Sequence, residues 1–335
     1  MKDNKYTPYD GQALATLVQN HRYTVDDSQF KTVVQVPKKE IVEDIAPYFP
    51  SKELIDAIEY ARILQRPLLL RGEPGCGKTR VAQALAYELY HQQKGDNYRN
   101  HYFEWFIKSS TKAKEGLYQY DHLGRLRDIQ TYNKQEPIAY RSFGPLGKAF
   151  LASKPDAPAV LLIDEIDKAD LDFPNDLLLE LDEKRFFIEE THEEIHAEHP
   201  PIVIITSNDE KELPNAFLRR CVFHYIEFPK LEELYQIAKA RVLSQEQEIK
   251  KAMPDTLVEK LVDQFYELHQ FMKASPNTDK RVSTSELLDW LRLIHHYYLT
   301  DKLPFEKDQL PANGLLYPEV LLKSLDDYKQ YAKKK

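Results

Sequence analysis

Residues 71–80 read RGEPGCGKTR and decide how the rest of the sequence is interpreted. Gly72, Gly77, Lys78 and Thr79 fit the pattern GxxxxGK[S/T], with an apolar strand candidate before the loop and a helical pattern after it. Glycines let successive backbone N–H groups face one point, and the N-terminus of the helix adds partial positive charge. The stretch therefore predicts a phosphate-binding loop, in which Lys78 reaches the β- and γ-phosphates and Thr79 binds Mg²⁺. The residues expected to contact the nucleotide are Gly72, Glu73, Pro74, Gly75, Cys76, Gly77, Lys78, Thr79 and Arg80.

Around this loop, short apolar segments alternate with amphipathic helical segments from about residue 51 to residue 228. Strands of this kind predict a parallel sheet that is covered by helices on both faces. Beyond Pro229 only helical patterns follow. We expect an N-terminal arm (1–50), an α/β core (51–229) and an all-helical lid domain (230–335). Within the arm, KTVVQV (31–36) is a β-prone run.

Several helices have recognisable starts. Ser51 is the N-cap candidate of SKELIDAIEYARILQ (51–65), Asp255 follows Pro254 at another start, and Ser283 with Glu286 forms a capping box. NDLLLELDEKR (175–185) and PEVLLKSLDDYKQYA (318–332) each read as one helix. The apolar face expected for the first helix consists of Leu54, Ile55, Ile58, Ala61 and Ile63.

A second chemical signal lies in AVLLIDEID (159–167), where two carboxylates follow a fully apolar strand. Ligands of open parallel sheets bind at the carboxyl ends of the strands. Asp164 is expected to hold the Mg²⁺ shell, and Glu165 to orient or deprotonate an attacking water.

The segments GEPGCGKT, LLIDEID, IITSND and LPNAFLRRC occur in this order, and with them the sequence resembles the AAA+ ATPases, the MoxR family among them. The resemblance extends from about residue 51 to the C-terminus. It implies an α/β P-loop AAA+ core with its parallel sheet between helices, plus a C-terminal all-helical lid. It also implies an Mg-dependent, ATP-hydrolysing, hexameric ring that remodels or activates a partner protein in a chaperone-like role. A von Willebrand A-type partner is implied by the resemblance alone.

The same resemblance implies further site residues. Asn208 matches the residue that positions the attacking water. Arg219 or Arg220 matches an arginine that acts on the nucleotide of a neighbouring subunit, and Arg220 is preferred because it lies closer to the next strand. Arg281 matches a second sensor that reaches the nucleotide from the lid. The sequences LRRC and KRVST depart from the usual motifs of the family. The identity of the arginine that acts on the neighbouring subunit, the arginine finger, and the geometry of the lid are therefore left open.

The segment from Lys114 to Phe150 resembles the MoxR insertion near the ring centre. Tyr118, Tyr120 and Phe143 either touch a client protein or anchor the loop against the core. RFFIEE (185–190) and IHAE (195–198) are expected to form the two arms of a hairpin.

Two alternatives belong to other classes of protein. His192, Glu193 and His196 spell HExxH, the zinc peptidase pattern, which requires both histidines on one face of a packed helix. Pro200 follows closely and few apolar residues surround the motif, so a polar hairpin is favoured. The other alternative is a nucleotide-gated P-loop subunit of a nucleic-acid-processing complex.

The composition limits the classes that remain. The 335 residues carry a formal net charge of −8, which gives no global basic field for nucleic acid or anionic lipid. No apolar run is long enough to insert into a membrane, and MKDNKYTPYDGQ lacks the apolar core of a signal peptide. We expect a cytoplasmic protein whose two cysteines, Cys76 and Cys221, are reduced thiols.

Overall fold

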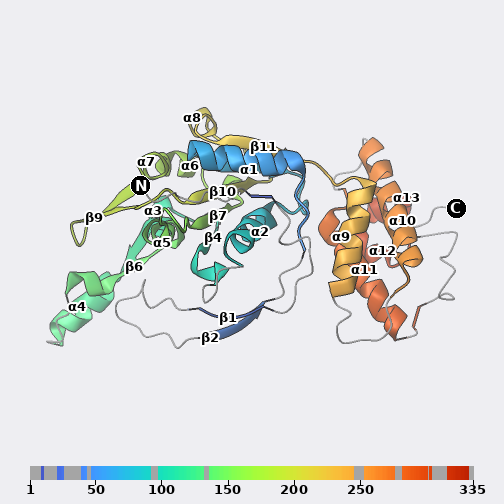
Figure 1. The fold of residues 1–335 in the computed structure, drawn as a ribbon, viewed down its shortest axis with the longest axis horizontal. Coiled ribbons are helices and arrows are strands. Elements are labelled where there is room, and N and C mark those ends of the chain that lie inside the picture. Colours follow the sequence, from blue (N-terminus) through green and yellow to red (C-terminus); the bar gives the residue numbers. More distant parts are fainter. Residues whose placement is uncertain are drawn as a thin grey trace.

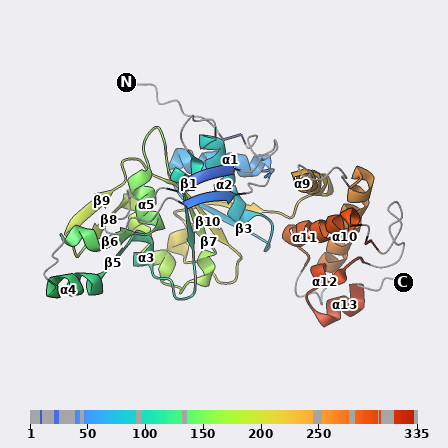
Figure 2. The ribbon, with the colours of Figure 1, turned by 90° about the horizontal axis from the view of Figure 1, so that it is seen from below.

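The computed structural model describes residues 9–10, 21–25, 39–43, 47–91, 97–131, 136–244, 253–275, 281–300, 302–303 and 315–331. A part built around a sheet lies beside a group of C-terminal helices, and α4 lies at the end opposite these helices in both views (Figures 1 and 2). The elements in chain order are β1 His21–Val25, β2 Lys39–Glu43, α1 Lys52–Leu64, β3 Leu68–Gly72, α2 Lys78–Tyr90, η2 Tyr98–Asn100, β4 Tyr102–Phe106, α3 Ala113–Leu117, β5 Tyr118–Tyr120, α4 His122–Gln130, η3 Pro137–Tyr140, β6 Arg141–Phe143, α5 Pro145–Ala152, β7 Val160–Asp164, η4 Ile166–Lys168, α6 Phe173–Asp176, α7 Leu178–Glu183, β8 Arg185–Ile188, β9 Glu193–His196, β10 Ile202–Ser207, α8 Asn215–Leu218, β11 Val222–Ile226, α9 Leu231–Ser244, α10 Asp255–Ala274, α11 Thr284–Leu299, α12 Pro318–Leu321 and α13 Leu325–Tyr331.

The central sheet has the strand order β11-β3-β10-β7-β4, and every neighbouring pair is parallel. Alternate residues of each strand face opposite sides, so Leu68 and Leu70 pack with α1 and α2, while Leu69 belongs to the core under α5 to α8. β7 and β10 are buried along their whole length. The predicted parallel sheet between two layers of helices is confirmed. Because all strands are parallel, their carboxyl ends meet at one edge.

The α1 helix begins as predicted, because the Ser51 side chain accepts a hydrogen bond from the Leu54 N–H at 3.2 Å. The prediction that Ile63 belongs to the buried apolar face of this helix is wrong, because its side chain is 68% exposed. It lies nine residues after Leu54, or two and a half turns, and therefore on the opposite side of the helix. Ala57 is buried instead.

Two helices that were predicted to be continuous are interrupted. The first is divided into α6 and α7 at Leu177. The second is divided into α12 and α13, because Leu322 is extended and the Ser324 hydroxyl accepts a hydrogen bond from the Asp327 N–H at 3.0 Å, which caps a new helix.

The C-terminal helices have a hydrophobic core of their own, which includes Phe265, Trp290 and Ile294. The predicted capping box of α11 is present, with the Ser283 N–H donating to Glu286 at 2.8 Å. None of the described helices combines the length and the apolar character needed to cross a bilayer.

Three small antiparallel pairs lie outside the central sheet: β1 with β2, β5 with β6, and β8 with β9. The β8–β9 pair is the predicted hairpin. The β1–β2 pair was not predicted, and the β-prone run 31–36 lies outside the described residues.

Candidate nucleotide site

The phosphate loop connects β3 to α2 at the carboxyl edge of the sheet. Gly75 and Gly77 have φ angles of 76° and 94°, in the left-handed region that glycine adopts without strain. Lys78 begins α2 and is only 6% exposed. Its Nζ donates hydrogen bonds to the carbonyl oxygens of Gly72 at 2.8 Å and Glu73 at 3.0 Å. The ammonium group thus lies against the loop, where phosphate oxygens would also meet backbone N–H groups at the start of α2.

Asp164 lies beside the start of the same helix. The Thr79 hydroxyl donates to Asp164 Oδ1 at 2.9 Å, and the buried Thr206 hydroxyl donates to the same oxygen at 2.6 Å. Asp164 is itself 8% exposed. A carboxylate and a hydroxyl next to a phosphate loop are hard oxygen donors of the kind that suit Mg²⁺, which prefers oxygen ligands and substrate phosphates.

Glu165 and Asn208 are brought together by neighbouring strands. Glu165 follows β7 with φ 58° and ψ 51°, a left-handed conformation that is uncommon outside glycine. Its N–H donates to the Thr206 hydroxyl at 2.8 Å, and its Oε1 accepts a hydrogen bond from Asn208 Nδ2 at 3.0 Å. Its other oxygen contacts Lys168, and this contact raises the pKa of the lysine. The Glu165 carboxylate is thereby directed by the protein rather than left free to rotate.

Two residues of this cluster were not predicted. Thr206 links the Asp164 carboxylate to the backbone of Glu165 through one hydroxyl, which donates to Asp164 and accepts from the Glu165 N–H. Asp167 is 2% exposed, and its Oδ2 accepts from the N–H groups of Asn208 at 3.0 Å and Glu210 at 2.9 Å. Asp167 therefore fixes the turn that carries Asn208. Both residues lie within the quoted segments LLIDEID and IITSND, but their roles depend on which strands are neighbours.

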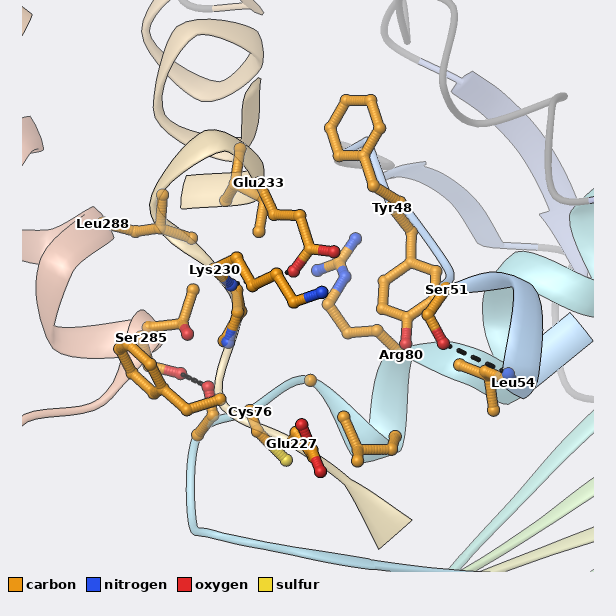
Figure 3. A pocket seen from close by; sticks show the side chains of 18 of the residues that line it. Tyr48, Ser51, Leu54, Cys76, Arg80, Glu227, Lys230, Glu233, Ser285 and Leu288 are labelled. Atoms are coloured by element: carbon orange, nitrogen blue, oxygen red, sulfur yellow. Dashed lines mark hydrogen bonds between the residues drawn. The ribbon is translucent and has the colours of Figure 1, made fainter. Parts of the chain in front are cut away.

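A cavity of about 660 Å³ lies between the phosphate loop and the C-terminal helices (Figure 3). It falls within the size range of small-molecule and cofactor sites. Tyr48, Cys76 and Arg80 line it from the sheet-containing part, and Lys230 and Leu288 from the other side. Burial holds the pKa of the Tyr48 hydroxyl well above its usual value. Residues 47–49, placed in the arm by the sequence, thus help to form the cavity.

The segment before α11 reaches the phosphate loop. Arg281 Nη1 lies 2.5 Å from Glu73 Oε1, and the Ser285 hydroxyl lies 3.4 Å from the carbonyl oxygen of Gly75. A Cβ atom on Gly75 would lie 2.7 Å from the Ser283 hydroxyl, so only glycine permits this approach. Arg281 is therefore placed at the loop, with a carboxylate as its present partner.

Arg219 and Arg220 lie at the other end of the sheet. Val222 pairs with Leu68, and the residues before Val222 lie beside the amino end of β3, about 13 Å from its carboxyl end. Arg220 Nε donates to Asp182 Oδ2 at 2.5 Å and its Nη1 to the carbonyl oxygen of Ala216 at 2.9 Å. Among the described residues the Arg219 guanidinium has no hydrogen-bond or ion-pair partner, and both arginines are exposed. The chain therefore does not bring these arginines to its own phosphate loop.

The HExxH segment does not form the zinc peptidase arrangement. His192 lies at the hairpin turn with φ 56°, and His196 is on β9, so the two histidines do not share a helical face. Glu193 pairs with Arg141, and His196 Nε2 lies 2.9 Å from Glu194 Oε2. Over the described ranges no group of three or more His, Cys, Asp or Glu side chains could hold a metal ion. The zinc peptidase alternative is therefore wrong for this structure.

The aromatic residues of the 114–150 segment are buried to different extents. Tyr118 is 2% exposed and stacks on Phe186, which is the anchoring role. Tyr120 and Phe143 are half-buried. Three of the exposed apolar residues of this segment are on α4, which buries none of its side chains. These residues are Leu123, Leu126 and Ile129.

A phosphate loop with two carboxylates and an asparagine at the carboxyl edge of a parallel sheet defines a P-loop nucleotide-binding domain. More particularly, residues 67–221 match the family described as AAA domain (dynein-related subfamily). The match covers slightly less than half of the chain. The predicted class, an α/β P-loop AAA+ core followed by a helical C-terminal part, is confirmed.

The other comparisons add little. A search of curated proteins found no match. Among solved structures, the chain is similar to NtrX from Brucella abortus in complex with ATP, with 15% sequence identity and a TM-score of 0.43. The similarity covers 78% of this chain and 54% of the NtrX chain, so this chain spans about half the length of that protein.

Proposed function

We propose that this chain is an Mg²⁺-dependent ATPase of the MoxR type, which assembles into a ring and uses ATP hydrolysis to remodel or activate a partner protein. The single observation that carries the proposal is the hydrogen-bonded cluster at the carboxyl edge of the sheet. There, Thr79, Asp164, Glu165 and Asn208 lie together beside the phosphate loop.

Each member of the cluster has a distinct role in this proposal. Lys78 binds the β- and γ-phosphates, and Thr79 and Asp164 hold the cation, which neutralises phosphate charge when bound. Glu165 orients or deprotonates the attacking water, and Asn208 directs Glu165 through their 3.0 Å hydrogen bond. The cavity between the loop and the C-terminal helices holds the base and the sugar.

The position of Arg219 and Arg220 supports a ring. An arginine that stabilises the charge of the transition state must approach the γ-phosphate, and these two lie at the opposite edge of their own sheet. In a ring, this edge of one subunit faces the phosphate loop of the next. We retain Arg220 as the preferred finger, which requires that it leave Asp182 on assembly.

The partner protein contacts α4 in this proposal. Leu123 is 74% exposed and Leu126 is 56% exposed, and α4 lies away from the C-terminal helices (Figures 1 and 2). Exposed apolar groups on a projecting helix are typical of protein contact sites. A von Willebrand A-type partner and a cytoplasmic location remain predictions.

The test measures ATP binding, ATP turnover and native mass for the wild type, Lys78→Ala and Glu165→Gln. We expect Lys78→Ala to lose nucleotide binding, because no other side chain replaces the buried ammonium. Glu165→Gln should bind ATP with hydrolysis reduced about 10²- to 10⁴-fold, the usual contribution of a general base. Normal turnover by Glu165→Gln contradicts the proposed role of this carboxylate. Turnover that requires DNA or RNA would instead favour the nucleic-acid-processing alternative.

A further inference from the structure

The phosphate loop contains a carboxylate that the proposed chemistry does not use. Glu73 follows Gly72, and its side chain is 31% exposed. Its backbone carbonyl accepts a hydrogen bond from Lys78, so this residue is part of the loop that is expected to receive phosphates. A negative side chain at such a position repels an incoming polyphosphate. The structure must therefore compensate this charge.

The compensating cation comes from the C-terminal part of the chain. Arg281 Nη1 lies 2.5 Å from Glu73 Oε1, although the two residues are 208 positions apart in sequence. Arg281 immediately precedes the buried Val282 and the capping box of α11, which fixes its backbone. The pair therefore connects the phosphate loop with the segment directly before α11, a helix that lines the nucleotide cavity.

The other oxygen of Glu73 faces a buried histidine on α10. His269 Nε2 lies 3.9 Å from Glu73 Oε2, and its ring stacks on Phe228 with centroids 3.6 Å apart. Burial lowers the pKa of His269, with Glu73 opposing and Arg281 and Lys273 adding to the shift. The imidazole is therefore neutral at neutral pH, and Arg281 is the cation that balances Glu73. His269 limits the space in which the carboxylate can turn.

We propose that Glu73 is a positioning residue, which holds Arg281 at the phosphate loop before nucleotide binds and releases it to the phosphate groups of the nucleotide. This inference rests on the proposed function, because it requires a nucleotide at the loop. A triphosphate carries more negative charge than one carboxylate, so it competes successfully for the guanidinium. The exchange couples nucleotide binding to the contact between the loop and the C-terminal helices. Part of the binding free energy is used to break the Glu73–Arg281 pair.

If Glu73 restrains Arg281, its neutralisation should tighten nucleotide binding. If Glu73 instead supports the shape of the loop, its neutralisation should weaken binding. Glu73→Gln removes the charge but keeps the shape, and Arg281 becomes available to the nucleotide. We expect the Kd and the KM for MgATP to fall about two- to fivefold, the size of one partly exposed ion pair. Arg281→Ala should weaken binding. In the Arg281→Ala background, Glu73→Gln should no longer tighten it.

The experiment is a titration of each purified full-length variant with a fluorescent ATP analogue in the presence of Mg²⁺, with steady-state ATPase kinetics for the KM. Glu259→Gln is the matched control, because it also neutralises one carboxylate of an ion pair, with Lys239, at 2.9 Å on the same helix as His269. We expect it to leave the Kd unchanged. Circular dichroism checks that every variant is folded.

Three outcomes separate the possibilities. If Glu73→Gln weakens binding, Glu73 supports the shape of the loop and the inference is wrong. If it tightens binding equally with and without Arg281, direct repulsion alone acts, and the inference is also wrong. If the wild type binds no nucleotide, the proposed function itself fails, and this result differs from either of the other two.

Discussion

The candidate site residues at the two edges of the central sheet differ in how firmly the chain holds their side chains. At the carboxyl edge, Asp164, Glu165 and Asn208 are held by hydrogen bonds within the same chain. At the amino edge, Arg219 and Arg220 are exposed, and within the described part of the chain Arg220 but not Arg219 has a carboxylate beside it. The residues proposed to act on the water are thus fixed by buried partners, whereas the residues proposed to act on a neighbour's nucleotide lie at the surface.

This difference has a physical reason. A general base works only at hydrogen-bond distance from its proton, so its side chain must be fixed before the substrate arrives. An arginine that acts on a neighbour's nucleotide is brought to the phosphates by subunit assembly instead, so its position within its own chain need not be the position in which it acts. The comparison therefore predicts that hydrolysis depends on one edge from each of two subunits.

Replacement of the exposed arginine should have the largest effect. We expect Arg220→Ala to reduce kcat for ATP about 10³- to 10⁵-fold, because the transition-state charge loses its guanidinium. Native mass spectrometry should show an assembly of unchanged size, since the substitution removes only exposed contacts, with Asp182 and with the carbonyl oxygen of Ala216. ATPase rates at saturating ATP measure the effect.

Mixing variants shows whether the arginine acts on a neighbour. Subunits with Arg220→Ala keep Glu165, and subunits with Glu165→Gln keep Arg220, so mixed rings contain some complete sites. Activity that reappears on mixing is the expected result. Arg219→Ala is the matched control for loss of a neighbouring guanidinium. An inactive mixture, or an Arg219→Ala variant that loses more activity than Arg220→Ala, would contradict the assignment.

Replacement of Thr206 tests whether its hydroxyl positions Asp164 and Glu165 at the carboxyl edge. Thr206→Val keeps the side-chain shape but leaves the Glu165 N–H without its acceptor and removes a donor from Asp164. An unsatisfied buried group costs about 1–3 kcal/mol, so the free energy of unfolding should fall by this amount. The Mg²⁺ concentration for half-maximal hydrolysis should rise about 10- to 100-fold, as is usual when a residue that supports a metal ligand is lost.

Thr206→Ser is the control for this prediction, because it retains the hydroxyl and loses one methyl group. Urea unfolding and a Mg²⁺ titration of ATPase activity distinguish the two variants. If valine and serine give the same Mg²⁺ requirement, the hydroxyl does not position Asp164, and the buried cluster is less constrained than its hydrogen bonds indicate.

Most of the fold could be predicted because local pattern and global packing agree. The apolar strands before the phosphate loop and before Asp164 could only be buried in a parallel sheet, and that sheet brings their carboxyl ends together. Asp167 and Thr206 were missed because their partners lie on other strands, and a single sequence does not give strand order. The Glu73–Arg281 pair was missed because its residues are 208 positions apart, and a single sequence does not show that the segment before α11 contacts the phosphate loop.

The remaining errors concern side-chain direction and exposure. Ile63 was assigned to a buried face that its helical position excludes, and Tyr118 was left between two roles that only burial separates. The cavity formed by residues 47–49 and α11 requires the placement of the C-terminal helices, which no periodic pattern specifies. Sequence patterns thus define which elements form, but not which distant side chains meet.

The smallest effect is expected in the alkylation of the two cysteines, one of which lies at each edge of the sheet. Burial raises the pKa of Cys221, next to Arg220, to about 12, so very little of this thiol is ionised at pH 8 and its alkylation is slow. Burial also raises the pKa of Cys76, but this residue lines the nucleotide cavity and lies near Lys78, which opposes the shift. We expect iodoacetamide to modify Cys76 faster, as measured by peptide mass spectrometry.

ATP at ten times its Kd should slow the modification of Cys76 about tenfold and leave Cys221 unaffected, because bound nucleotide covers only the carboxyl edge. Equal protection of both thiols would mean that the nucleotide acts through the whole fold, and the separation of the two edges would then be wrong.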